Sequence, residues 1–239
     1  MTGPRPAGWR TDLAAGFAAG APLVAGVLPF ALIYGALARE VGLSLGQTAG
    51  MSLTVFAGAS QLIFLNLWGA GASCLVIIVA GLVVNLRLTM YSVSLAPHLG
   101  RPGWGPRLAA AYFITDESYS VSIGRFLSPR PQPASPFFFF LGSGWPCWLS
   151  WQAGGVAGHL AGALLPEAAG RILALAVPLI FLALLIPLLT KGPRLSAALA
   201  ASAATVAGAG LPSNLGLIAA VTAGLAAGLL HRKIKCGAA

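Results

Sequence analysis

Long apolar runs separated by short charged segments dominate the chain. Five runs without charge contain 26, 46, 36, 19 and 37 residues, and they follow Asp12, Glu40, Arg130, Arg171 and Arg194. A helix needs about 20 apolar residues to cross a bilayer. As one helix, the 46-residue run would be roughly 69 Å long against a hydrocarbon core of ~30 Å. This run therefore predicts two spans, with a turn near residues 69–71.

The pattern predicts an all-α, polytopic membrane bundle of seven or eight helices, some of them broken or kinked. The expected spans are 13–38, 48–68, 72–95, 107–126, 136–164, 172–190, 195–210 and 214–231. The fifth is long and contains Pro146, which favours a tilt or a kink. The last two are short and could instead form a re-entrant pair. We expect one transmembrane domain over 13–231, with tails at 1–12 and 232–239.

Charge is scarce, and its positions predict an orientation. Only 19 of 239 residues are charged, or 8%, whereas an ordinary soluble domain has about 25%. This excludes a soluble globular protein, and the high apolar content excludes disorder. With an inside N-terminus, nine basic residues lie inside and four outside, which predicts that both termini are cytoplasmic. The net charge of +9 is thus a topology signal, and we expect no nucleic-acid partner.

Cysteine and histidine give no recognisable site. The three cysteines and three histidines are scattered, without metal-ligand spacing, so we expect no metal and no cofactor. Ser60 and His159 are the only nucleophile and base candidates, and neither lies in a catalytic motif. We therefore predict a protein that is not an enzyme.

Few ionisable residues fall well within the predicted spans, and each is costly there. They are Arg87 in the third span, and Asp116 and Glu117 in the fourth. We expect Arg87 to pair with Asp116 or Glu117 across two helices. Two readings stay open: a static ion pair, or a charged cluster that couples transport to protons.

Helical spacing assigns these residues to faces. Arg87, Tyr91 and Ser94 form one stripe, and Asn85 belongs to another. In the fourth span, a continuous helix would align Tyr112, Asp116 and Ser120 at i, i+4 and i+8.

The first two spans contain helix-disturbing residues that favour a substrate site. Pro22 and Pro29 lie in the first span, and Gly58, Ser60 and Gln61 lie in the middle of the second. Interrupted helices in transporters use their free backbone groups to hold substrate. We expect these five residues and Asn85 to bind substrate, with Phe56, Ile63 and Phe64 around an aliphatic side chain. Ordinary kinks packed against neighbours are the alternative.

Small residues recur at the spacing that lets helices approach closely. The three stretches are Gly16-xxx-Gly20, Gly154-xxx-Gly158-xxx-Gly162 and Gly224-xxx-Gly228. We expect helix packing at these faces.

The order of motifs resembles the AzlC family of branched-chain amino acid permeases. The similar stretches are GALAREVG (35–42), MSLTVFAGASQ (51–61), NLR (85–87), 91–99 and TDE (115–117). The family continues NLR with His, whereas this chain has Leu88. The resemblance implies a large subunit that exports valine, leucine, isoleucine or analogues, together with a small AzlD-like membrane subunit.

The alternative transport class is the membrane subunit of an ATP-driven amino acid transporter. Residues 167–170 read EAAG, which echoes the start of a coupling loop, but the glycine follows too early and the predicted side is outside. No Walker A sequence is present, so an ATPase would be a separate chain.

Overall fold

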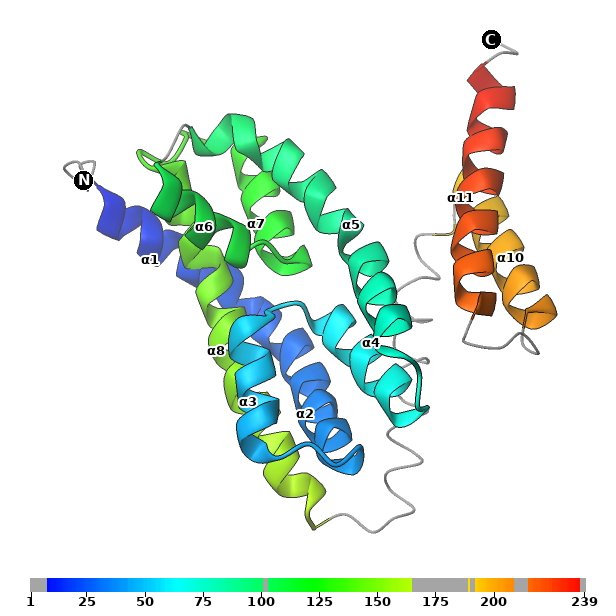
Figure 1. The fold of residues 1–239 in the computed structure, drawn as a ribbon. Helices are drawn as coiled ribbons and strands as arrows, with labels where there is room; N and C mark the ends of the chain where they lie inside the picture. The colour runs from blue at the N-terminus through cyan, green and yellow to red at the C-terminus, as the bar shows by residue number, and fades with distance from the viewer. Residues whose placement is uncertain (1–7, 101–102, 165–188, 190–191, 209–214, 237–239) are drawn as a thin grey trace. The chain divides into compact units, whose positions relative to one another are not determined.

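The computed structural model describes residues 8–100, 103–164, 189, 192–208 and 215–236. The described residues form helices and no strand, which confirms the all-α prediction (Figure 1). The helices are α1 (Trp9–Gly20), the 3-10 turn η1 (Ala21–Leu23), α2 (Val24–Glu40), α3 (Leu45–Thr54), α4 (Gly58–Gly69), α5 (Cys74–Leu99), α6 (Trp104–Tyr112), α7 (Asp116–Phe126), α8 (Pro136–Gly162), α10 (Gly192–Ala207) and α11 (Leu215–Cys236).

Helices long and apolar enough to cross a membrane occur at two places in the described residues. One is the continuous helical run Trp9–Glu40, made of α1, η1 and α2, and the other is Cys74–Leu99. The predicted spans 13–38 and 72–95 fall on them, and the predicted turn near 69–71 separates α4 from α5. The protein is thus an all-α membrane protein. The predicted span 172–190 lies almost wholly outside the described residues.

Several helix ends follow from local chemistry. Ser44 and Gln47 form a capping box that begins α3, and Thr115 and Ser118 form one that begins α7. Gly42 and Gly71 take φ values of 84° and 69°. This left-handed conformation suits glycine and ends α2 and α4.

The described chain divides into two compact units. The first takes in residues 8–65 and 81–164, and the second takes in 66–80 and the described residues from 189 onward. In the second unit, α10 and α11 form an antiparallel pair, since Gly192 approaches His231 while Gly224 approaches Ala197. Gly228 also meets Ala197, so the predicted packing role of the Gly224/Gly228 face is confirmed.

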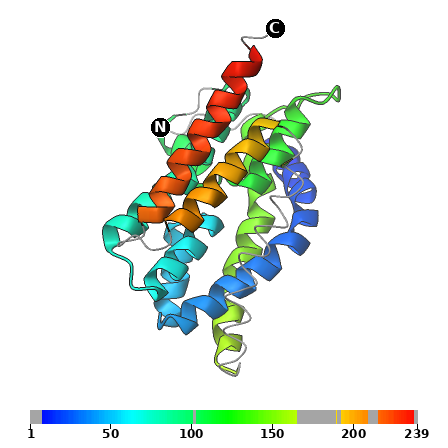
Figure 2. The same ribbon diagram turned by 90° about the vertical axis from the view of Figure 1, so that its right-hand side faces the viewer.

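In the first unit, the run α1–α2 packs along α8 through backbone contacts (Figure 1 and Figure 2). A Cβ added to Gly16 would come within 2.1 Å of the Phe139 carbonyl oxygen, and one at Gly158 within 2.1 Å of the Leu32 oxygen. Only glycine permits this approach, which confirms the other two predicted glycine faces. The paired residue numbers rise together, so the two helices are parallel.

An aromatic core joins the other side of α8 to α5, α6 and α7. Its buried members are Leu95, Ala110, Phe113, Ile114, Phe126, Phe139 and Phe140. Asp12 of α1 accepts a hydrogen bond from the Ser135 N–H at 2.7 Å. This carboxylate therefore lies at the N-terminus of α8, where the helix dipole favours negative charge.

Candidate functional site

Two of the predicted spans are interrupted helices, and their interruptions meet. Residues 55–57 separate α3 from α4, and residues 113–115 separate α6 from α7. The Phe56 ring lies 6.0 Å from that of Tyr112 and 6.4 Å from that of Phe113. The Tyr112 hydroxyl donates to the Leu53 carbonyl at 2.8 Å. The predicted disturbance of the second span is confirmed.

The prediction of a continuous helix over 107–126 was wrong. Thr115 is extended and begins a new helix through its capping box, so Tyr112 belongs to a different helix from Asp116 and Ser120. The expected alignment of these three residues on one face does not exist. A Thr-Asp-Glu-Ser sequence supplies the cap and the acidic first turn that favour a helix start.

Side chains satisfy most backbone groups that the interruptions release. The Ser52 carbonyl accepts from Gln152 Nε2 at 3.2 Å, and the Phe113 carbonyl accepts from Ser118 Oγ at 2.6 Å. The start of α4 is different. Ala57 accepts the first helical bond, from the Gln61 N–H at 3.1 Å, but alanine has no side-chain oxygen to cap the N–H groups of residues 58–60.

A buried polar cluster lies between α2, α3, α4 and α8. We use this name for the residues Tyr34, Thr48, Ser52, Gln61, Trp151 and His159. Tyr34 donates to the Thr48 carbonyl at 2.7 Å, and Thr48 Oγ1 lies 2.9 Å from His159 Nδ1. These bonds tie α3 to α2 and α8.

Part of the polar cluster is unpaired. Ser52 Oγ, both polar atoms of the Gln61 amide and Trp151 Nε1 are sealed from solvent without a hydrogen-bond partner in the described structure. Buried polar atoms are paired in most proteins, because each unpaired group costs roughly 1–3 kcal/mol. This concentration of unpaired atoms makes the polar cluster a candidate binding site.

The predicted ion pair is present, and Arg87 takes Asp116 as its partner. Arg87 Nη1 lies 2.8 Å from Asp116 Oδ2, and Tyr91 donates to Asp116 Oδ1 at 2.8 Å. The side chains of Arg87 and Asp116 are 37% and 43% exposed, so the pair is only half-buried. Glu117 has no ion pair among the described residues.

The predicted faces of α5 are confirmed. Arg87, Tyr91 and Ser94 all face α7, where Tyr119 donates to Ser94 at 3.2 Å and stacks on Tyr91 at 4.2 Å. Asn85 faces α4 instead, and its Oδ1 accepts from Ser60 Oγ at 2.7 Å. Ser60 and Asn85 thus connect α4 to α5.

The two prolines of the first span lie apart from these groups. Pro22 is in η1, where the helix tightens to a 3-10 turn, and Pro29 is inside α2. Both are exposed, so the structure does not bring them together with Gly58, Ser60 and Gln61.

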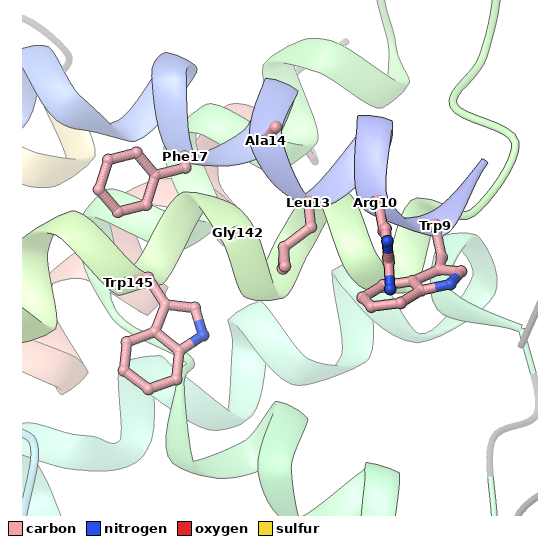
Figure 3. Close-up of a pocket in the computed structure, with 7 residues that line it drawn as sticks. All are labelled: Trp9, Arg10, Leu13, Ala14, Phe17, Gly142 and Trp145. Carbon is pink, nitrogen blue, oxygen red and sulfur yellow. The ribbon is translucent and has the colours of Figure 1, made fainter.

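An open apolar groove of about 530 Å³ lies where α1 meets α8. Figure 3 shows Leu13, Phe17 and Trp145 along it, with the Arg10 guanidinium over the Trp9 ring at 5.2 Å. Its lining has no buried polar group, which sets it apart from the polar cluster. The described residues contain no group of three His, Cys, Asp or Glu side chains that could hold a metal ion.

Reasoning from sequence alone missed several members of the polar cluster. Thr48 and Ser52 are spaced i, i+4, which places two small hydroxyls on one face of an apolar helix. That spacing was a usable signal. Trp151 gives no such signal, because its role depends on Gly58, more than 90 residues earlier.

Comparisons with known proteins agree with these observations. The model of the AzlC protein family matches residues 22–165. An uncharacterized membrane protein of Archaeoglobus fulgidus is 32% identical over 213 residues, which are 85% of this chain and 88% of that protein. The inner membrane protein YgaZ of Escherichia coli is 24% identical over 160 residues, which are 66% and 64% of the two chains. No solved structure shows significant similarity. The matched region contains both interrupted helices, the polar cluster and the ion pair, and the chain belongs to the AzlC family.

Proposed function

We propose that this chain transports branched-chain amino acids across a bacterial inner membrane, with export as the direction and without chemical change. The carrying observation is that two interrupted helices meet beside a buried, unpaired amide, that of Gln61. Interrupted helices in transporters lie where substrate binds near the membrane midplane. In this proposal the chain is multi-pass with both termini in the cytoplasm. It is the large subunit of a two-component permease whose small subunit is AzlD-like.

The substrate in this proposal binds at the start of α4. Gly58 lets the Trp151 ring lie directly against the start of α4. Gln61 supplies an unpaired amide, and Ser60 and Asn85 connect α4 to α5. Phe56 is buried at the interruption. Together with the partly buried Ile63 and Phe64, it supplies apolar surface for an aliphatic side chain. Burial of roughly 100 Å² of that side chain would contribute about 2.5 kcal/mol.

Protons are the proposed coupling ion, and Asp116 and Glu117 are the proposed acceptors. Asp116 joins α7 to α5 through Arg87 and Tyr91. Protonation would remove the charge that holds Arg87, and so loosen the contact between the two helices. Glu117, without an ion pair in the described structure, offers a second carboxylate on the same turn.

The test is efflux of labelled leucine from cells that contain this chain and its small subunit, at two external pH values. Export that depends on the chain supports the proposal, and no chain-dependent flux of leucine, valine or isoleucine refutes it. The Asp116→Asn variant tests coupling. We expect its flux to fall and to lose its pH dependence, whereas undiminished and still pH-dependent export would exclude Asp116 as the coupling residue.

A further inference from the structure

The unpaired atoms of the polar cluster surround the first turn of α4. Ser52, Gln61 and Trp151 are only 2%, 1% and 6% exposed. The six-membered ring of Trp151 covers Gly58, since a Cβ added there would come within 2.6 Å of its Cη2. Trp151 also stacks on Tyr34 at 5.6 Å, and the Tyr34 hydroxyl lies near the Ser52 and Gln61 side chains, outside hydrogen-bond distance. These groups therefore share one neighbourhood.

The unpaired atoms are mainly donors. The Ser52 hydroxyl, the Gln61 amide nitrogen and the Trp151 indole nitrogen each carry a hydrogen to donate. The N–H groups of residues 58–60, which have no acceptor within α4 itself, add further donors, and the helix dipole places about half a positive charge at the same point. A ligand that satisfies these groups must offer several acceptor oxygens and a negative charge.

The charge balance restricts that ligand further. Ser52, Gln61 and Trp151 are neutral, so a doubly charged phosphate would stay largely unneutralised in a buried place. A carboxylate carries one charge, and its two oxygens can accept from several donors at once. The remaining acceptor, Gln61 Oε1, can receive a hydrogen from an ammonium group beside the carboxylate.

We infer that the first turn of α4, together with Ser52, Gln61 and Trp151, binds the carboxylate of an α-amino acid. The inference deepens the proposed function, on which its choice of an amino acid rests. Trp151 and Ser52 become specificity-determining residues, because they select a ligand that has a carboxylate over one that has only an ammonium group.

The experiment is a binding titration with the purified full chain in lipid nanodiscs. The probes are leucine, 4-methylpentanoate (which lacks the ammonium group) and 3-methylbutylamine (which lacks the carboxylate). We expect the first two to bind and the amine not to compete. Trp151→Phe keeps an aromatic ring but removes the N–H together with the second ring of the indole, and we expect about tenfold weaker binding of both carboxylates. Trp145→Phe is the matched control, since Trp145 lies on the same helix with 38% exposure, and we expect it to bind as the unaltered chain does.

A second variant keeps the test decisive if Trp151→Phe fails to fold. Gln61→Glu is nearly isosteric and adds a negative charge, so it should abolish carboxylate binding through repulsion. The inference is overturned if neither carboxylate binds, if the amine competes with leucine, or if Trp151→Phe and Gln61→Glu bind unchanged. Variant-sensitive binding of 4-methylpentanoate without leucine transport would support the carboxylate site and refute the proposed function. Leucine transport by the unaltered chain, with leucine binding unchanged in both variants, would support the proposed function and refute the carboxylate site.

Discussion

The contact between α2 and α8 leads to a sharp prediction, the destabilisation caused by Gly35→Ala. A Cβ at Gly35 would lie 2.0 Å from the Gly155 carbonyl oxygen and 2.6 Å from the His159 backbone nitrogen. Both neighbours are backbone atoms of α8, so no side chain can rotate away. The two helices must separate, although an alanine adds only one methyl group.

The magnitude follows from the geometry. Ordinary van der Waals contact begins near 3.4 Å, so the helices must move apart by roughly 1 Å or more, with loss of dispersion contacts along the face. Overpacking of this kind costs about 1–3 kcal/mol, and the better helix propensity of alanine offsets up to ~1 kcal/mol. We expect a net loss of about 1–2 kcal/mol. At roughly 2–4 °C per kcal/mol for a chain of this size, the melting temperature should fall by several degrees.

The assay is thermal unfolding of the purified chain in one detergent, with Gly26→Ala as the matched control. Gly26 is on the same helix and has no atom within 4 Å of an added Cβ, so its variant should melt at or slightly above the temperature of the unaltered chain. Equal melting temperatures for the two variants would refute the close backbone contact. A Gly35→Ala variant that is more stable than Gly26→Ala would refute the packing of α2 on α8 altogether.

Two further predictions concern the interrupted helices. Tyr112→Phe removes the bond to the Leu53 carbonyl and leaves Trp148 Nε1 without the acceptor it has at 2.8 Å. The free energy of unfolding should therefore fall by about 1–3 kcal/mol. An unchanged melting temperature would show that the two interruptions do not depend on this bond. The double variant Arg87→Met with Asp116→Leu should fold, with a loss of no more than ~1 kcal/mol in the free energy of unfolding, because the pair is half-exposed. We expect this variant to export leucine without pH dependence. Normal pH-dependent export would show that the pair is purely structural.

Patterns along single helices could be predicted from the sequence because they depend on local geometry. The i, i+4, i+7 stripe of Arg87, Tyr91 and Ser94 holds wherever α5 is helical, and the opposite direction of Asn85 follows from the same 100° per residue. The turn near residues 69–71 was predictable from length alone. Glycine spacing likewise identified packing faces before any partner was known.

The fourth span could not be predicted correctly because its interruption is decided by two opposed tendencies. Apolar length favours one helix over 107–126, while Thr115 and Ser118 favour a new start through a capping box. The local cap prevails here because Ser118 also satisfies the Phe113 carbonyl that the interruption releases, and because Tyr112 bonds to the Leu53 carbonyl at the other interruption. Such bonds between distant segments are invisible in the spacing of charges.

The polar cluster could likewise be predicted only in part, because it depends on contacts between distant segments. The interruption near Gly58 and the polar Gln61 could be identified locally, but Trp151 reaches them only because Gly155 and Gly158 bring α8 against α2. The two prolines gave a misleading local signal, since both lie on the exposed face of the first span.

The kinds of contact that α8 makes suggest which parts of the first unit stay fixed during transport. Its contact with α1–α2 is backbone against backbone at several glycines, so sliding would force carbonyl oxygens into the opposite chain. Its contacts with the interrupted helices are side-chain hydrogen bonds, from Gln152 to the end of α3 and from Trp148 to the end of α6. A side-chain bond can be exchanged for another partner at a net cost of about 1 kcal/mol. We therefore expect the parallel pair of α1–α2 with α8 to act as the scaffold, and α3 and α6 to move, each about its non-helical joint.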